Sequence, residues 1–215
     1  MELIDLSHSI EHGMITYKGL PAPLICDYLS REDSKKNYAA GTEFQIGKIE
    51  MVTNTGTYLD CPFHRYANGK DLSQIQLEKL AELEGVLIDV ENIQAVSKKF
   101  FDNKNISGKA VLVHTGWSKH WRTDAYFENH PFLTADAADY LVSQNVKLVG
   151  IDSHNIDDTR TNSRPVHSAL LKNEILIVEH MTSLHLLKEK EFIFNAVPPK
   201  FVGVGTFPVR AFAKV

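Results

Sequence analysis

The sequence predicts an α/β fold, a mixed sheet with helices packed on it. Short aliphatic runs recur along the 215-residue chain, and amphipathic stretches separate several of them, as in strand–helix–strand units. Further short runs lie outside these units and indicate extra strands. Hydrophobic residues make up 43% of the chain, which is enough for one substantial core and fits one domain or two small ones.

The first fifty residues alternate between ordered and irregular stretches. Glu2–Ser7 alternates apolar and polar residues and predicts an opening or edge strand. Residues 12–27 are rich in glycine and proline, and residues 28–41 are polar, so we expect an irregular loop followed by a mobile one. Residues 42–53 alternate again and predict a strand that leads into segment 54–64.

The rest of the chain carries the strand–helix–strand units. Residues 77–83 predict a short helix that Gly85 ends, and Thr134 is a suitable N-cap for a helix reaching Gln144. Residues 166–172 predict a further helical turn. The aliphatic runs that predict strands are 86–90, 110–115, 147–152, 175–178, 192–197 and 206–212.

Charge and targeting signals exclude several classes of protein. The net charge is −4, which does not give the basic surface of a nucleic-acid binder. The N-terminus lacks the pattern of a signal peptide, and no apolar run reaches the roughly 18 to 20 residues that span a bilayer. We therefore expect no membrane partner and a cytoplasmic location. Cys26 and Cys61 form no CxxC pair, which excludes a cysteine zinc site.

Segment 54–64, NTGTYLDCPFH, carries the strongest functional signal. Asp60 precedes His64 by four residues, and Gly56 and Pro62 constrain the backbone around them. Polar groups on a constrained loop are typical of a functional site, because loops on rigid scaffolds carry most chemistry. The alternative is that this pair is merely solvated.

Further acids and imidazoles follow the buried strands. Glu179 ends the run ILIV, and burying a carboxylate there is unfavourable unless a cation or a partner neutralises it. Groups just past strand ends line the ligand crevice of α/β proteins, so these residues predict a metal site or an acid–base pair. Asp152 has the alternative of capping a turn. The remaining candidates are His154, Asp157, Asp158, His167 and His180. For Asp157 and Asp158 the alternative is a surface ion network with Arg160 and Arg164.

Landmarks along nearly the whole chain resemble the cyclase family of metal-dependent hydrolases, which includes kynurenine formamidases and isatin hydrolases. Segment 54–64 is similar to the family signature H-x-G-T-H-x-D-x-P-x-H, with Asn54 and Tyr58 in place of two histidines. Outside the signature, the stretches that match in order are IDLSHSIEHGM, VLVHTGWSKHW, LVGIDSHNID, VHSALL, IVEHMTSL and FPVRAFA.

The resemblance implies a metal site made by Asp60, His167 and Glu179, with help from Asn54, and His64 as a proton shuttle. Because amide and carboxylate oxygens replace imidazoles, the set favours manganese, magnesium or calcium over zinc, or one metal ion instead of two. We expect manganese or zinc, with magnesium as the alternative. His154 and His180 are candidates to replace the missing ligands.

The predicted activity is metal-dependent hydrolysis of a small amide or cyclic amide, as in an arylformamidase. Tyr58 would donate a hydrogen bond to the oxyanion, Tyr17 would form a pocket wall, and Thr57 would shape the substrate-binding loop. The sequence does not separate a formamide from a lactam or lactone. Two alternatives stay open: a metal-free relative that only binds a small molecule, and a metal-independent lyase or isomerase that uses His64 and Glu179.

The resemblance also implies the quaternary and tertiary structure. The fold would be the swivelling β/β/α type, with residues 1–215 as a single cyclase-like domain. The chain would form a homodimer or homotetramer, with a neighbouring subunit at the pocket.

Overall fold

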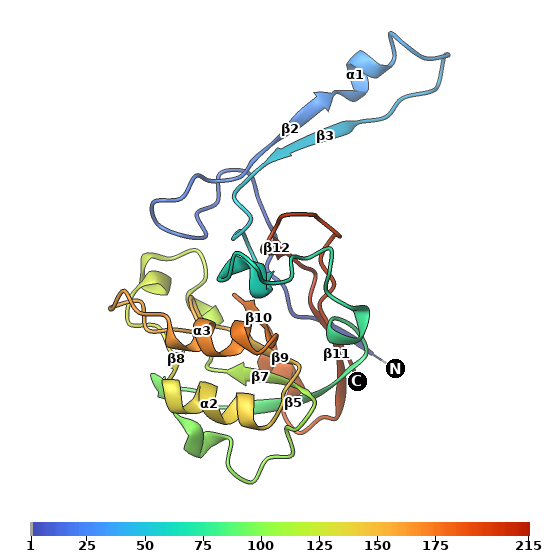
Figure 1. The fold of residues 1–215 in the computed structure, drawn as a ribbon. Helices are drawn as coiled ribbons and strands as arrows, with labels where there is room; N and C mark the ends of the chain where they lie inside the picture. The colour runs from blue at the N-terminus through green and yellow to red at the C-terminus, as the bar shows by residue number, and fades with distance from the viewer. Residues whose placement is uncertain (1) are drawn as a thin grey trace.

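The computed structural model describes residues 2–215 and is built around a curled nine-stranded sheet (Figure 1). In spatial order the strands are β1 (Leu3–Asp5), β13 (Phe212–Lys214), β11 (Phe192–Asn195), β5 (Leu83–Asp89), β7 (Ala110–His114), β9 (Leu148–Ile151), β10 (Leu176–Glu179), β4 (Tyr58–Asp60) and β12 (Thr206–Pro208). The four central strands β5, β7, β9 and β10 are parallel, and every other pairing is antiparallel. The predicted mixed sheet is therefore confirmed.

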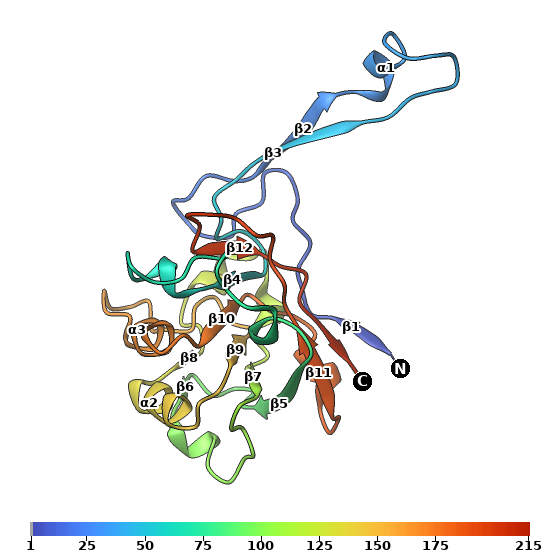
Figure 2. The ribbon, with the colours of Figure 1, turned by 45° about the vertical axis from the view of Figure 1, so that its right-hand side comes forward.

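The central strands separate two hydrophobic clusters because successive side chains point to opposite faces. In β7, Val111 and Val113 pack in one cluster, whereas Leu112 packs in the other. Helices α2 (Ala135–Ser143) and α3 (Pro165–Lys172) cover the face of the valines (Figure 2). Strands buried on both faces need apolar residues at every position, which explains why these strands are continuous aliphatic runs.

A two-stranded arm projects from this body (Figures 1 and 2). It consists of β2 (Leu24–Leu29) and β3 (Ile46–Glu50), with the single helical turn α1 (Arg31–Ser34) near its tip. The side chains of β3 are all exposed, and so are those of β2 apart from its last residue. The loops predicted for residues 12–27 and 28–41 were wrong for residues 24–29, because these residues form β2 and pair with β3. A second small sheet joins β6 (Ala95–Val96) to β8 (Phe132–Leu133).

Three element predictions need correction. Asp60 does not lie on a loop, because Tyr58–Asp60 forms β4 between β10 and β12. The helix predicted for 77–83 is a 3₁₀ turn over Leu77–Lys79, and Gly85 lies inside β5 rather than ending that helix. A Cβ at Gly85 would lie 1.9 Å from the Phe192 ring, so close strand packing accounts for this glycine. The strand predicted for 206–212 is two strands, β12 and β13.

The other predicted strands and helices agree with the structure to within a few residues. The sequence gives no apolar helix of spanning length, and within residues 2–215 no helix is long and apolar enough to cross a membrane. Both ends of the described chain lie together at one edge of the sheet, where β1 pairs with β13 (Figure 2).

Candidate metal centre and active site

A cavity of about 250 Å³ opens where β4, β10 and the start of α3 meet. Parallel strands deliver their carboxyl ends to one edge of the sheet, and Glu179 is the last residue of β10. The residues that line the cavity are Tyr17, Asn54, Tyr58, His64, Arg65, Asn155, Arg164, His167 and Glu179. The sequence thus predicted most of the wall but missed Arg65, Asn155 and Arg164 as lining residues.

Asp60 ends β4 and is completely buried beside this cavity. Its Oδ1 accepts a hydrogen bond from the Thr206 hydroxyl on the neighbouring strand β12. Its Oδ2 has no hydrogen-bond partner, and it lies 3.6 Å from Nε2 of His167. A buried carboxylate oxygen without a donor is unfavourable, so this atom is a strong candidate to bind a cation.

His64 ends the 3₁₀ turn Pro62–His64 that follows β4, and its side chain is about one-third exposed. Its Nδ1 lies 2.8 Å from the Thr206 hydroxyl oxygen. Because that hydroxyl donates its one hydrogen to Asp60, it accepts from His64, which assigns the proton to Nδ1. The remaining nitrogen, Nε2, is then free to act as a base or a ligand.

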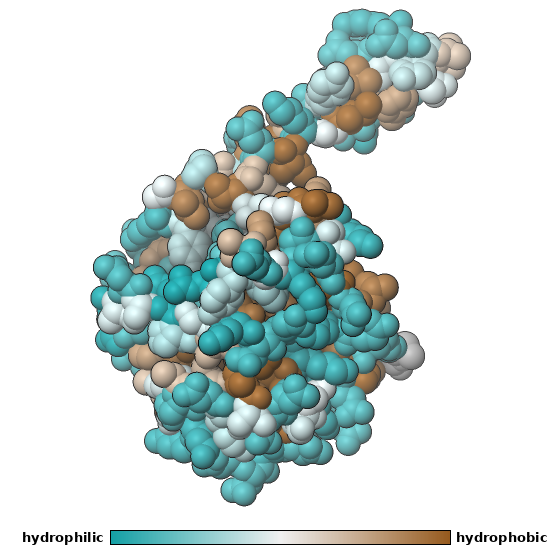
Figure 3. All heavy atoms as spheres, in the orientation of Figure 1, coloured by the Kyte–Doolittle hydropathy of each residue, from teal (hydrophilic) through white to brown (hydrophobic). Residues whose placement is uncertain are grey.

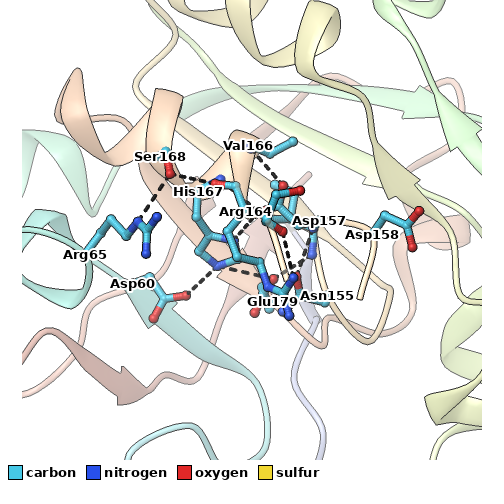
Figure 4. Close-up of polar contacts among 12 residues, drawn as sticks. Asp60, Arg65, Asn155, Asp157, Asp158, Arg164, Val166, His167, Ser168 and Glu179 are labelled. Carbon is cyan, nitrogen blue, oxygen red and sulfur yellow. Dashed lines mark hydrogen bonds and ion pairs between the residues drawn. The ribbon is translucent and has the colours of Figure 1, made fainter. Parts of the chain in front are cut away.

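His167 lies in the first turns of α3, where Asp157 fixes its orientation (Figure 4). Oδ2 of Asp157 is 2.7 Å from His167 Nδ1, and the same carboxylate accepts the backbone N–H groups of Val166 and His167. The ring is held with Nε2 3.6 Å from Asp60 and 3.7 Å from Glu179. A carboxylate that orients a histidine in this way is typical of metal sites.

Glu179 is 1% exposed, and both of its oxygens are bound. Oε1 accepts from the backbone N–H of Ile156, and Oε2 accepts from the Tyr58 hydroxyl, both at 2.6 Å. Burial raises the pKa of Glu179 to about 7; the charge of His167 lowers that pKa, and the nearby charge of Asp60 raises it. This carboxylate therefore lies in a site that already holds too much negative charge.

The charges around His167 also indicate an excess of negative charge in this site. Burial alone would lower the pKa of His167, but Glu179, Asp157 and Asp60 together raise it to about 10. Three buried carboxylates around one imidazole leave excess negative charge, which a divalent cation would neutralise. One ligand atom from each of Asp60, His64 and His167 lies within 4.8 Å of the others, a spacing suited to one ion. Imidazole nitrogen and carboxylate oxygen are suitable ligands for manganese and zinc.

The two residues that replace family histidines lie on the cavity wall. Asn54 lines the cavity, and its Oδ1 lies 3.5 Å from the Thr53 hydroxyl. Burial, followed by the charge of Glu179, raises the pKa of Tyr58 well above its usual value, so its hydroxyl stays protonated. A neutral phenol that already donates to Glu179 is a poor metal ligand.

The predicted substrate-binding residues lie in different places. Tyr17 lines the cavity, where its hydroxyl accepts from Asn155 Nδ2 at 2.7 Å and donates to the His154 carbonyl at 3.1 Å. Thr57 is buried and does not belong to the cavity wall. Its hydroxyl donates to the His180 carbonyl and accepts from the His8 N–H, so it ties three segments together behind the site.

His154 and His180 do not join the metal candidates, since neither lines the cavity. They pack instead in a group of aromatic rings, in which the centre of the His154 ring lies 4.4 Å from that of Tyr17 and, edge to face, 5.6 Å from that of His180. Asp152 caps a turn, but not the one after its own strand as the alternative interpretation predicted: it accepts the N–H groups of Thr115 and Gly116 in the turn after the neighbouring strand β7.

Asp157 is the principal residue that sequence reasoning underestimated. The surface ion network is correct for Asp158, which pairs with Arg160 at 2.8 Å, but wrong for Asp157, which is completely buried. A usable signal was present: Pro165 marks the first turn of a helix, and an acid shortly before that point is well placed to bind its free N–H groups.

The fold is that of an α/β protein with a curled mixed sheet and two covering helices. Its buried acids and imidazoles gather at the strand ends, as in proteins that bind a metal ion. A family model described as "Putative cyclase" matches residues 4–158, and the chain belongs to this family. It is 27% identical over 212 residues to a kynurenine formamidase from Bacillus cereus, covering 98% of this chain and 96% of that protein.

Solved structures agree with this assignment. One is titled as a potential metal-dependent hydrolase with cyclase activity; it is 25% identical, with a TM-score of 0.79 over 99% of this chain and 96% of its own. An isatin hydrolase bound to thioisatinate shares the fold at 20% identity, with a TM-score of 0.81 over 100% of this chain and 92% of its own. The cyclase-type fold implied by the sequence is therefore confirmed.

Proposed function

We propose that this chain is a metal-dependent hydrolase of a small amide or cyclic amide. It acts on carbon–nitrogen bonds other than peptide bonds, as the names of its relatives indicate. The observation that supports this most directly is the unpartnered Oδ2 of Asp60, which points toward His167 beside a cavity. Family membership alone would not locate the chemistry, and this buried acceptor supports placing it beside the cavity.

Asp60, His167 and Glu179 would hold the cation, with Asn54 completing the set. A divalent ion bound there supplies Lewis-acid activation of the amide carbonyl and of water. Manganese or zinc fits the mixture of imidazole and carboxylate ligands, and magnesium is the alternative. Because the Tyr58 hydroxyl occupies one oxygen of Glu179, the set suits one ion better than two.

His64 would move the proton. With Nδ1 held by Thr206, its Nε2 accepts a proton from the attacking water and returns it to the leaving nitrogen as the carbon–nitrogen bond breaks. The products are a carboxylic acid and an amine. Tyr58 stays a neutral phenol on the cavity wall, and its single hydrogen would turn from Glu179 to the carbonyl oxygen as negative charge develops there.

The test is hydrolysis of two aryl formamides, formanilide and N-formyl-kynurenine, by chelator-treated protein with added manganese, zinc or magnesium. We expect metal-dependent release of formate, and loss of at least about 100-fold in kcat/KM for His64→Gln and Asp60→Asn. Hydrolysis or elimination that survives chelation would favour the metal-independent acid–base enzyme. Binding without turnover under every condition would favour the metal-free relative.

We propose that the chain forms a homodimer or homotetramer through its arm. A two-stranded hairpin is marginally stable in water by itself, yet this arm exposes apolar side chains along its length (Figure 3). Its exposed apolar residues are Leu24, Ile25, Tyr28, Ile46 and Ile49.

Light scattering after size exclusion should give a multiple of 24.2 kDa for the wild type and a smaller mass for Ile49→Asp. A wild-type monomer would contradict the proposal.

We also propose a cytoplasmic location, which the cysteines support. Cys26 is exposed and Cys61 is buried, and neither forms a disulfide. An exposed thiol of this kind fits a reducing compartment.

A further inference from the structure

We propose that Arg65 and Arg164 form a carboxylate-binding subsite in the cavity wall, so that the amide substrate carries a carboxylate away from its scissile bond. This inference rests on the proposed hydrolase function and adds a substrate class to it. Small-molecule sites usually fix orientation with a few placed polar groups, and these two permanently charged guanidinium groups are part of the cavity wall.

The first argument is that neither arginine has an acidic partner. Three of the four other arginines, Arg122, Arg160 and Arg210, each pair with a carboxylate at 2.7 to 2.8 Å. The fourth, Arg31, is exposed in α1 near the tip of the arm, away from this cavity. Within residues 2–215, no carboxylate oxygen lies within 4.0 Å of Arg65 or Arg164. Two unpaired guanidinium groups on the same small cavity therefore leave positive charge for a ligand to neutralise.

The second argument is that the protein positions both side chains (Figure 4). Nη1 of Arg164 donates to the carbonyls of Thr161 and Ser163 at 2.8 and 2.7 Å. Nε of Arg65 donates to the Ser168 hydroxyl at 3.2 Å, and that hydroxyl donates to the Arg164 carbonyl at 2.7 Å. Ser168 thus connects the two arginines, and both Nη atoms of Arg65 and Nη2 of Arg164 stay available for a ligand.

The third argument concerns size and charge. The cavity of about 250 Å³ is below the roughly 300 to 1,000 Å³ of drug-sized sites, so the substrate is small. Glu179 and Asp60 make the deep end negative, and a substrate carboxylate would be repelled there. The arginines supply the opposite charge, and their planar forks match the geometry of a carboxylate. An anionic amide would therefore place its carboxylate at the arginines and its amide near His64.

The kinetic test compares formanilide with 2-, 3- and 4-formamidobenzoate, which add one carboxylate to the same formamide. We expect kcat/KM for at least one benzoate to exceed that for formanilide by about 10-fold or more, and Arg65→Gln to lower kcat/KM for that benzoate about 10-fold more than it lowers kcat/KM for formanilide. Arg65 is exposed, so this substitution does not endanger folding. Arg160→Gln, which removes a guanidinium group paired with Asp158, is the matched control.

A binding test separates this inference from the proposed function. Titration calorimetry of benzoate and benzamide needs no turnover; we expect benzoate to bind about 10-fold tighter or more, and Arg65→Gln and Arg164→Gln to weaken benzoate alone at equal metal content. Arginine-dependent benzoate binding without formamide hydrolysis would uphold the subsite and refute the hydrolase. Equal affinity for the two probes, or benzoate binding unchanged in both variants, would overturn the subsite.

Discussion

At the residue scale, the site depends on side chains that orient other side chains. Thr206 connects Asp60 to His64 through one hydroxyl, and Asp157 connects the start of α3 to the His167 ring. Neither residue lines the cavity, yet each fixes the direction of a predicted ligand or base. Positioning of this kind explains how exposed His64 keeps a defined geometry.

Asp157→Asn should weaken metal binding about 10- to 100-fold, because the amide can no longer hold His167 as the carboxylate does. Titration calorimetry with manganese on chelator-treated protein measures this effect. Asp158→Asn is the control, because the Asp158 carboxylate is next to Asp157 in the sequence but pairs with Arg160 at the surface. Equal loss of affinity in both variants would show that Asp157 has no specific role.

Thr206→Val keeps the shape of the side chain but removes the hydroxyl that bridges Asp60 and His64. Leaving a buried carboxylate oxygen without its donor should lower the free energy of unfolding by about 1 to 3 kcal/mol. Urea denaturation measures this, and formanilide turnover should fall in the same variant. Thr206→Ser retains the hydroxyl and should restore both properties; a serine variant as impaired as the valine variant would contradict the bridging role.

At the scale of elements, the long aliphatic strands were predictable and the short ones were not. The strands β7, β9 and β10 are buried on both faces, so their sequences are continuous apolar runs. β4 has only three residues, and Tyr58 and Asp60 at its ends are polar because they belong to the site. β2 escaped prediction because its stability depends on pairing with β3 rather than on a buried face.

The same limit applies to the site. Asp60, His167 and Glu179 come from two strands and a helix, and the sequence identified them because each matched a family motif. Asp157 ends the matching stretch LVGIDSHNID, but the resemblance gave it no role, and the two cavity arginines lie outside every matching stretch. The roles of all three become clear from their three-dimensional surroundings.

Gly205 lets the segment before β12 pass against the turn that carries His64. A Cβ at this position would lie 2.3 Å from the His64 backbone nitrogen, and backbone atoms have little freedom to move aside. Gly205→Ala should therefore destabilise the protein by about 1 to 3 kcal/mol and displace His64 from Thr206. Thermal unfolding and formanilide kinetics check this. Gly47→Ala in the arm has a nearest neighbour at 3.4 Å and should leave catalysis unchanged; normal turnover by Gly205→Ala would contradict the argument.

At the scale of the whole molecule, the two hydrophobic clusters share one sheet, so we propose that the chain unfolds as a single unit. Three imidazoles near the site influence how that stability depends on pH: His154 and His180, which are buried, and His8, which is partly buried. Burial lowers the pKa of His8 to about 4 and of His154 to about 3, and it lowers the pKa of His180 well below its usual value. These imidazoles are neutral in the folded state.

Between pH 6.5 and about 4 the unfolded chain therefore binds protons that these histidines cannot take up when folded. Each of these histidines should therefore lower the free energy of unfolding by about 1.4 kcal/mol for every pH unit by which the pH falls in this range. The raised pKa of Glu179 has the opposite effect on stability as the pH falls. Because Glu179 is present in both wild type and His154→Phe, its effect cancels when the two are compared. Urea titrations across this range should show a smaller loss of stability on acidification in the variant. Identical pH slopes would contradict buried neutral His154.

The central claim is that Asp60, His167 and Glu179 share one cation with help from Asn54. Titration calorimetry of manganese and zinc into chelator-treated protein tests this most directly. We predict one ion per chain with micromolar or tighter affinity for the wild type and loss of binding in Asp60→Asn, whose change is confined to the carboxylate with the unpartnered oxygen. Absence of binding in the wild type, or equal binding by wild type and variant, would contradict the account.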